Sequence, residues 1–448
     1  MNAAAMTVTD MPVHALRGTL VWFRDDPFIV DPSVAMRVET DGIVAMAGGR
    51  IIACGPAAAV LPTLPPGVQP VHYERSLILP GFIDAHTHYV QAQIVGSCGA
   101  QLLDWLERYT YVAEQAFVDP RHSAHIARLF CDELLRHGTT TAVTFCAVYP
   151  QSAEALFEEA ERRNMRLIAG KVLMDRHAPE GLRDTAQQGY DDSRALLQKW
   201  HGRGRCLYAI TPRYAGSSSP AQLEIAGALW REYPQAYMHS HLAENLAEVE
   251  WVRRLFPDAR DYVDVYDRFG LLGPRAIYAH GIHLAERELQ RLGESRTTIV
   301  HCPTSNLFLG SGLFRLHAAK QRAAALHVAL GTDIGAGTSY SLLQTMGDAY
   351  KIAQLNHHTF SAPQAYFLAT LGSARALGLE DRIGSLEPGH EADIVVLDAE
   401  ATPALRLRTQ RAENIKELLF ALMIMGDDRA VRATYIAGML AHDRDAAR

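Results

Sequence analysis

Apolar and polar positions in the middle of the chain alternate between two kinds of segment. Short runs rich in β-branched and aromatic residues are typical of buried strands. Each is followed by a stretch with the 3.6-residue spacing of an amphipathic helix, as at 152–164. We find eight such apolar runs: 77–88, 139–148, 165–175, 206–214, 236–244, 275–283, 297–306 and 327–335. Eight strands that alternate with helices predict an α/β fold, a (β/α)8 barrel.

The two ends of the chain show a different pattern, of short strands and turns. Gly48 and Gly49 stand between two apolar runs and predict a hairpin. The segments 391–398 and 431–440 have similar strand-like runs. Neither end is long enough to bury a core alone, so we expect them to pair. The predicted domains are a composite β domain of residues 1–76 plus 385–448, and a catalytic barrel of residues 77–384.

Composition limits the classes of protein to consider. The chain has 448 residues, of which 48% are hydrophobic, and this is enough for a large core. A net charge of −7 without a basic block argues against nucleic acid or an anionic membrane as a partner. The start lacks a signal-peptide pattern, no apolar run approaches a membrane span, and the six cysteines are scattered. We therefore expect a cytoplasmic protein with free thiols.

Polar side chains gather where the predicted strands end, which is the catalytic face of such a barrel. In "LPGFIDAHTHYVQ" (79–91), Asp84, His86 and His88 share one face of a strand, because strands alternate with period two. Later runs end in further polar residues: Arg213, His241, Glu244, His280, His301 and Asp333. Imidazole and carboxylate groups are the ligands that a catalytic divalent metal prefers. The pattern predicts a metal site at this face.

A His-x-His pair alone is weak evidence, since 20 histidines in 448 residues give about one such pair by chance. A second pair, His239 and His241, is present. We expect His239, one layer deeper, to hydrogen-bond or pack behind a ligand. Lys171 lies within the third run, before its end, and is interpreted as structural, so one metal is predicted rather than two. The pattern leaves open whether His301 supports a ligand or faces the substrate.

At this point the residues resemble a family. "PGFIDAHTH", "HLAEN", "HG", "HCPTSN" and "GTDIG", in that order, resemble the metal-dependent amidohydrolases, which flank a distorted (β/α)8 barrel with a small β-sandwich. Within that superfamily, "GAQLLDWLERYTYVAE", "TPRY" and "NLFLGSGLF" resemble the guanine deaminase branch, over nearly the whole chain. The resemblance implies one Zn²⁺ per chain, with iron possible. It implies these ligands: His86, His88, His241, His280 and Asp333.

The same resemblance implies a purine base as substrate and the release of ammonia from C2 of guanine, a step of purine metabolism. Glu244, Asp333 and His280 are the implied catalytic residues. The implied substrate-binding residues are Gln91, Arg213, Tyr214, His88, His241 and Glu244. The guanidinium fork of Arg213 suits the acceptors O6 and N7 of guanine, whereas adenine carries an amine at C6. The chain departs from the usual pattern of the branch at Val90, Tyr214 and His239.

Three alternatives remain. A ring deaminase acting on 8-oxoguanine, a pterin or an s-triazine would use the same metal and acid, and the set Gln91, Arg213 and Tyr214 favours guanine over these. A cyclic amide hydrolase would carry two metals and a carboxylated lysine on the fourth strand, where this chain has Arg213. A non-catalytic relative would be expected to lose ligands. A homodimer is common in this fold family, and the apolar segment 414–427 is interpreted as core packing in preference to a subunit contact.

Overall fold

The computed structural model describes residues 11–99, 101–321 and 326–446. Eight parallel strands follow one another around a barrel in the order β5-β6-β7-β9-β10-β11-β12-β13, and the short β8 pairs with β9. Their bounds are β5 Phe82–His88, β6 Thr139–Phe145, β7 Arg166–Gly170, β8 Val172–Leu173, β9 Cys206–Pro212, β10 Tyr237–Leu242, β11 Ala276–His280, β12 Thr298–His301 and β13 His327–Leu330. Each of the eight predicted runs contains one of the barrel strands, which confirms the predicted fold class.

The barrel closes where the segment after β13 lies against β5. The backbone N–H of Asp333 donates to the carbonyl of His86 at 2.9 Å, and that of His88 donates to the carbonyl of Ile334 at 2.7 Å. The carboxylate of Asp84 accepts from the N–H of Thr332 at 3.0 Å and also from its hydroxyl. These bonds hold Asp333 beside the end of β5.

The run 77–88 is two strands rather than the single strand expected. β4 (Val71–Pro80) belongs to a second sheet, and β5 begins the barrel. The chain passes from the second sheet into the barrel at Gly81. Glycine is required there, because a Cβ at this position would collide with the side chain of Thr140. The side chains on both sides of Gly81 are buried. The apolar pattern therefore contains no polar break that would reveal the crossing.

The second sheet joins both ends of the chain, as predicted. Its seven strands run in the order β16-β15-β14-β4-β1-β2-β3. The further bounds are β1 His14–Phe23, β2 Met36–Ala47, β3 Arg50–Pro56, β14 Ile394–Asp398, β15 Val431–Ile436 and β16 Met439–Asp443. The hairpin between β2 and β3 turns at Gly48 and Gly49, both at positive φ. Strands from both ends of the chain contribute to a common apolar core, in which the hydroxyls of Tyr73 and Tyr435 hydrogen-bond at 2.6 Å, and a smaller cluster packs α2 against the sheet. The domain division at residues 76 and 385 stays a prediction.

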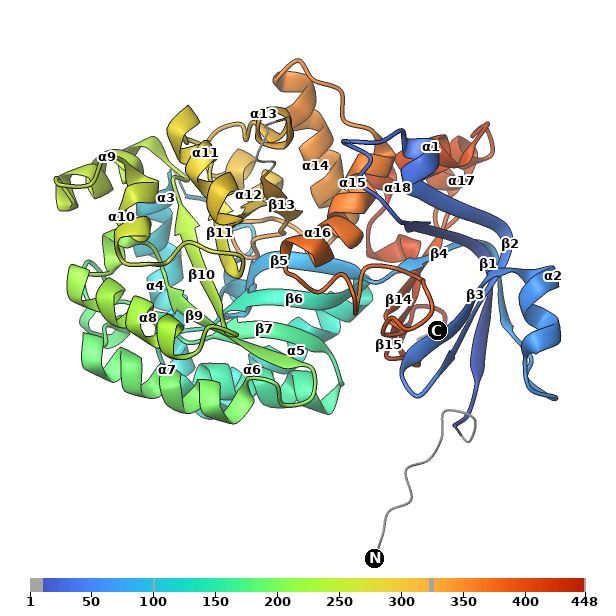
Figure 1. Ribbon diagram of the computed structural model, residues 1–448, viewed down its shortest axis with the longest axis horizontal. Coiled ribbons are helices and arrows are strands. Elements are labelled where there is room, and N and C mark those ends of the chain that lie inside the picture. Colours follow the sequence, from blue (N-terminus) through green and yellow to red (C-terminus); the bar gives the residue numbers. More distant parts are fainter. Residues whose placement is uncertain (1–10, 100, 322–325, 447–448) are drawn as a thin grey trace, which may run out of the picture.

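Helices cover the outside of the barrel, and the second sheet lies beside it (Figure 1). In α5, Asp119 caps the first turn at Arg121, while Ile126, Phe130 and Leu134 form the buried stripe expected of an amphipathic helix. The helices are α1 Pro32–Ala35, α2 Ala57–Val60, α3 Leu102–Trp105, α4 Tyr111–Gln115, α5 Pro120–Arg136, α6 Pro150–Arg162, α7 Ala186–Trp200, α8 Pro220–Glu232, α9 Leu246–Leu255, α10 Tyr262–Arg268, α11 Glu286–Ser295, α12 Pro303–Phe308, α13 Leu316–Lys320, α14 Leu342–Leu355, α15 Ala362–Ala369, α16 Leu371–Ala376, α17 Pro403–Thr409 and α18 Ile415–Met425. A π-helical turn, Leu106–Thr110, joins α3 to α4.

The apolar segment 414–427 forms α18, which packs mainly against the molecule itself. Leu419, Leu422 and Met423 are buried, whereas Ile424 and Met425 remain exposed. Its neighbours are α14, α15 and α17. This arrangement agrees with the interpretation as core packing.

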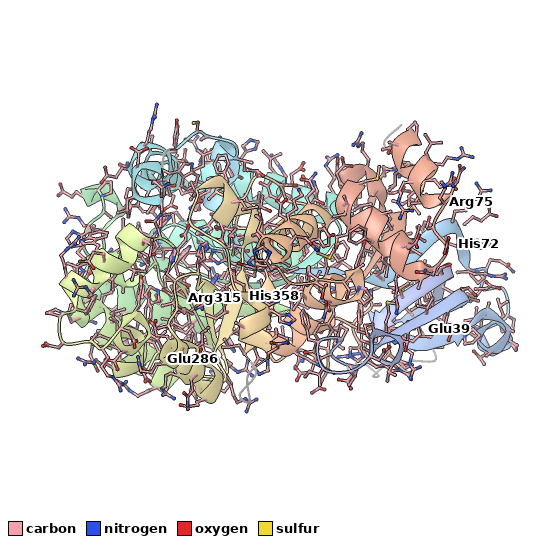
Figure 2. The ribbon with its side chains drawn as sticks, turned by 90° about the horizontal axis from the view of Figure 1, so that it is seen from above. Glu39, His72, Arg75, Glu286, Arg315 and His358 are labelled. Carbon is pink, nitrogen blue, oxygen red and sulfur yellow. The ribbon has the colours of Figure 1, made fainter. Side chains whose placement is uncertain are left out.

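The surface and the thiols also agree with the sequence. Figure 2 shows side chains with nitrogen and oxygen atoms over the whole molecule, with His72 and Arg75 on the second sheet and Arg315 on the barrel. All six cysteines are free, as predicted. Within the described residues, no helix has the length and apolar character needed to cross a membrane.

Candidate active site

Four side chains converge at the C-terminal end of the barrel strands. The Nε2 atoms of His86 and His88 are 3.2 Å apart, and each lies 3.2 Å from Oδ1 of Asp333. Nε2 of His241 lies 3.2 Å from Nε2 of His88. His86 and His88 come from β5, His241 from β10, and Asp333 from the segment after β13. Strands from opposite sides of the barrel thus bring three imidazoles and one carboxylate to a single point.

The geometry of this cluster fits a divalent metal. Two ligands of a tetrahedral zinc with bonds of about 2.0–2.1 Å lie about 3.3–3.4 Å apart, close to the separations seen here. Nδ1 of His241 faces the carbonyl of Arg213 at 2.7 Å. A carbonyl can only accept, so Nδ1 carries the proton and Nε2 keeps its lone pair for a metal.

The protonation of the cluster fits a metal as well. Burial lowers the pKa of His86 and brings that of His88 to about 3, and it holds the pKa of His241 well below its usual value. Burial alone would raise the pKa of Asp333, but the adjacent His86 and His88 outweigh it and keep that pKa well below the usual value. Neutral imidazoles around an ionised carboxylate are the form in which such ligands bind a metal.

His239 and Asp84 support the cluster from behind. Nδ1 of His86 lies 2.8 Å from Nε2 of His239, so His239 hydrogen-bonds to a candidate ligand, as expected. The sequence pattern predicts Asp84 on the same strand face as His86 and His88, but the pairing of β5 with β6 shifts register between Asp84 and Thr87, which interrupts the alternation. The carboxylate of Asp84 is bound to Thr332 instead. Burial raises the pKa of Asp84 to about 7. Asp84 therefore fastens β5 to the segment that carries Asp333.

His280 and Glu244 form a pair beside the cluster. Nδ1 of His280 donates to Oδ1 of Asn306 at 2.9 Å, which leaves the lone pair of Nε2 facing inward. That Nε2 lies 3.3 Å from Oε2 of Glu244 and 3.8 Å from Oδ2 of Asp333. Burial, helped by the negative charges of Asp333 and Glu248, raises the pKa of Glu244 well above its usual value. A protonated Glu244 can donate toward His280, and such a carboxyl is suited to act as a general acid.

Two of these residues have an uncommon backbone. His280 has a φ of 73° and Asp333 a φ of 53°. Positive φ is rare for residues other than glycine and is concentrated at functional sites. His280 is the last residue of β11 and Asp333 lies three residues beyond the end of β13, and at both positions the side chain points toward the cluster.

A partly open hollow adjoins the cluster, and its atom-free space, including the solvent at its mouth, is about 430 Å³. Its walls include all six residues implied to bind substrate: Gln91, Arg213, Tyr214, His88, His241 and Glu244. Trp105, Leu106 and Leu309 supply apolar surface. An apolar hollow with a few polar groups in its wall, called the slot below, is typical of a site for a small ligand.

Comparisons with known proteins agree with this geometry. The model of the amidohydrolase family matches residues 77–441. The chain belongs to the amidohydrolase family. It is 46% identical over 411 residues to the guanine deaminase of Escherichia coli K12, covering 92% of this chain and 93% of that protein. The solved structure of E. coli guanine deaminase superposes with a TM-score of 0.93 at 43% identity, over 97% of this chain and all of the other. A guanine deaminase from C. acetobutylicum, solved with guanine in its active site, matches with a TM-score of 0.84 at 26% identity, over 96% of this chain and 100% of that one. The predicted resemblance is confirmed.

The sequence pattern of this amidohydrolase did not identify one buried residue beside the site, Glu114. Glu114, on α4, accepts from Nη1 of Arg213 at 2.9 Å and 2.8 Å through its two oxygens, and from Nε2 of Gln91 at 3.2 Å. It is fully buried. The only sequence signal was its place in "LLDWLERYTYVAE", a stretch that carries the resemblance but lies far along the chain from Arg213.

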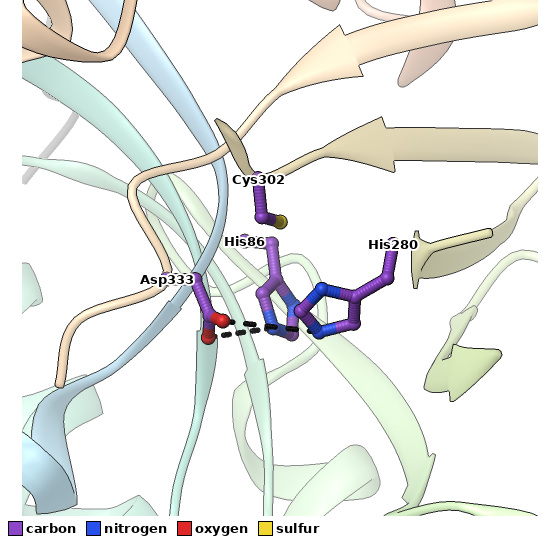
Figure 3. Close-up of side chains that lie close together, drawn as sticks. All are labelled: His86, His280, Cys302 and Asp333. Carbon is purple, nitrogen blue, oxygen red and sulfur yellow. Dashed lines mark ion pairs between the residues drawn. The ribbon is translucent and has the colours of Figure 1, made fainter. Parts of the chain in front are cut away.

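Lys171, His301 and Cys302 are also placed by the structure. Nζ of Lys171 forms a buried ion pair with Asp184 at 2.6 Å, which agrees with a structural role. His301 faces away from the cluster and stacks on Phe314 at 4.9 Å between ring centres. The next residue, Cys302, points the other way and lies near His86, His280 and Asp333 (Figure 3). Neighbouring side chains at the end of β12 thus point to opposite faces, as in an extended strand.

Proposed function

We propose that this protein hydrolyses guanine at C2, giving xanthine and ammonia, with the residues of the cluster as its catalytic centre. The observation that carries the proposal is the convergence of three imidazoles and Asp333 beside the buried acid Glu244, at the end of a slot with a guanidinium in its wall. The similarity to guanine deaminases over nearly the full length supports the same substrate.

His86, His88, His241 and Asp333 would hold one divalent metal, which we propose to be zinc, with His280 as a further donor beside it. Such a metal supplies Lewis acidity that lowers the pKa of water and so provides a nucleophile near neutral pH. The carboxylate of Asp333 is placed to take a proton from the attacking water. Because its pKa is held well below the usual value, it starts the reaction ionised.

Glu244 and His280 would carry out the remaining proton transfers. Glu244 starts protonated and gives its proton to N3 of the ring, which weakens ring conjugation as C2 becomes tetrahedral. His280, 3.3 Å from Glu244 and 3.8 Å from Asp333, can pass a proton to the departing amine. Proton transfers of this kind are worth about 10²–10⁴-fold each in rate.

Arg213 and Gln91 would select the ring. The guanidinium of Arg213 donates toward O6 and N7, and adenine would place an amine against it. Leaving buried donors unpaired in this way costs roughly 10⁴-fold or more in specificity. Tyr214 is buried against the slot, where its ring can stack on the purine. We also propose a cytoplasmic location and a homodimer, as the composition and the fold family suggest.

The test is ammonia release by the metal-analysed protein with guanine, 8-oxoguanine and adenine measured side by side. We expect fast turnover of guanine, about one zinc per chain, and little turnover of adenine. Activity on a different ring, with guanine untouched, would retain the metal chemistry and refute the substrate.

A further inference from the structure

Glu114 lies behind the slot rather than in it. It is not among the described residues that line the hollow, yet it contacts two that do, Arg213 and Gln91. Both of its oxygens accept from a single nitrogen of Arg213, at 2.8 Å and 2.9 Å. This one buried carboxylate therefore holds both recognition side chains.

The pairing also fixes the charge of the slot. Arg213 is almost completely buried, and its guanidinium is always ionised. In a buried site the charge of an unpaired guanidinium acts strongly over short distances, because the effective dielectric constant is low. The adjacent carboxylate cancels that charge, while the N–H groups of Arg213 remain hydrogen-bond donors. The slot thus offers donors without a net positive charge from this pair.

We propose that Glu114 determines which rings the slot accepts, favouring neutral oxopurines and rejecting anionic ones. Guanine is neutral near pH 7 and needs only donors for O6 and N7. Its hydrolysis product is more acidic, because a second carbonyl replaces the amine beside a ring N–H. An unpaired Arg213 would retain that product once it ionised, whereas the neutral pair lets it leave. This inference rests on the proposed function for the identity of the ring.

Other charged groups face the same space and are common to all variants. Glu244, Glu248 and Asp333 also line the hollow. Their effect on the binding of anions is present with and without Glu114. A comparison between the wild type and a Glu114 variant therefore isolates the contribution of this one carboxylate.

The test uses urate, an anionic purine, as the probe, with its affinity measured by calorimetry on the zinc-loaded protein. Glu114→Gln removes the charge and should tighten urate binding about tenfold, with stronger inhibition by xanthine and a higher KM for guanine. Glu114→Asp keeps the charge but shortens the reach, so it should raise KM without tightening urate. The double variant Glu114→Gln with Arg213→Gln should lose the tighter urate binding. Glu107→Gln, exposed on the same segment, is the matched control and should behave as wild type.

The outcomes separate the inference from the proposed function. Wild-type protein that does not release ammonia from guanine refutes the function, while the urate comparison still tests the charge. Turnover of guanine with unchanged urate affinity in Glu114→Gln overturns the inference alone. If neither Glu114 variant folds, Glu114 is a structural support, and the inference is likewise overturned.

Discussion

The hydrogen bond between His86 and His239 allows a quantitative prediction about metal affinity. When Nε2 of His86 serves as a ligand, its proton sits on Nδ1 and is donated to Nε2 of His239, 2.8 Å away. Both rings are completely buried, so water cannot replace the acceptor. The substitution His239→Leu keeps a similar side-chain volume and removes the hydrogen-bond acceptor.

The cost falls on the metal-bound state. Without metal, His86 can place its proton on Nε2 instead, toward Oδ1 of Asp333 at 3.2 Å. With metal, Nδ1–H is buried and unpaired, at a cost of about 1–3 kcal/mol. That range corresponds to a loss of roughly 5- to 150-fold in affinity, consistent with the usual effect of removing such supporting residues.

The assay is zinc affinity by competition with a chelator, alongside urea unfolding of the metal-free protein. We expect His239→Leu to weaken zinc binding about 10- to 100-fold and to leave the metal-free unfolding midpoint nearly unchanged. His239→Gln, whose amide oxygen can accept the same proton, should recover most of the affinity. Two results would refute this reasoning. One is a wild-type zinc affinity in His239→Leu, and the other is a lower unfolding midpoint of the metal-free protein without any change in zinc affinity.

Three further predictions concern other residues. Glu244→Gln should lower kcat for guanine about 10²–10⁴-fold with ligand affinity retained, as measured by steady-state kinetics and calorimetry; near-normal kcat would remove Glu244 as the acid. Lys171→Met leaves Asp184 buried without its partner and should cost about 3 kcal/mol in urea unfolding without changing KM, whereas Lys199→Met, at an exposed pair, should cost less than about 1 kcal/mol. Burial alone would raise the pKa of Asp264, but hydrogen bonds from two neighbouring arginines lower it from 3.8 to about 2. Because the folded-state pKa is the lower one, Asp264 stabilises the fold above about pH 4, and this stability is lost as the pH falls toward 2. Unfolding midpoints of Asp264→Asn between pH 5 and 3 should fall less steeply than those of the wild type, and parallel curves would contradict the assignment.

The sequence predicts the barrel well because its signal is local. Each strand is a short apolar run, and period-two alternation places His86 and His88 on one face without knowledge of the rest of the fold. The polar ends of the runs then identify the catalytic face, which includes His241 and Asp333. The crossing at Gly81 is missed because the last five residues of β4 and all of β5 are buried, so no polar residue marks it.

The remaining features depend on long-range contacts. His280 and His301 both end a buried strand, and a strand buried on both faces carries no alternation to show which one points inward. The structure turns His280 inward at positive φ and His301 outward against Phe314. The hydrogen bond between Glu114 and Arg213 joins residues 99 positions apart, so the local sequence pattern around either residue does not predict it.

The place of β14 between β4 and β15 has a consequence for synthesis on the ribosome. β4 is made early, yet one of its edges stays unpaired until β14, more than 300 residues later, has emerged. At about 5–20 residues per second this delay lasts roughly 15–60 s. During that time the nascent chain presents an open strand edge, the kind of template on which polypeptides aggregate. A chain released before residue 394 therefore cannot complete the sheet beside the barrel, and we expect it to depend on chaperones or to be degraded.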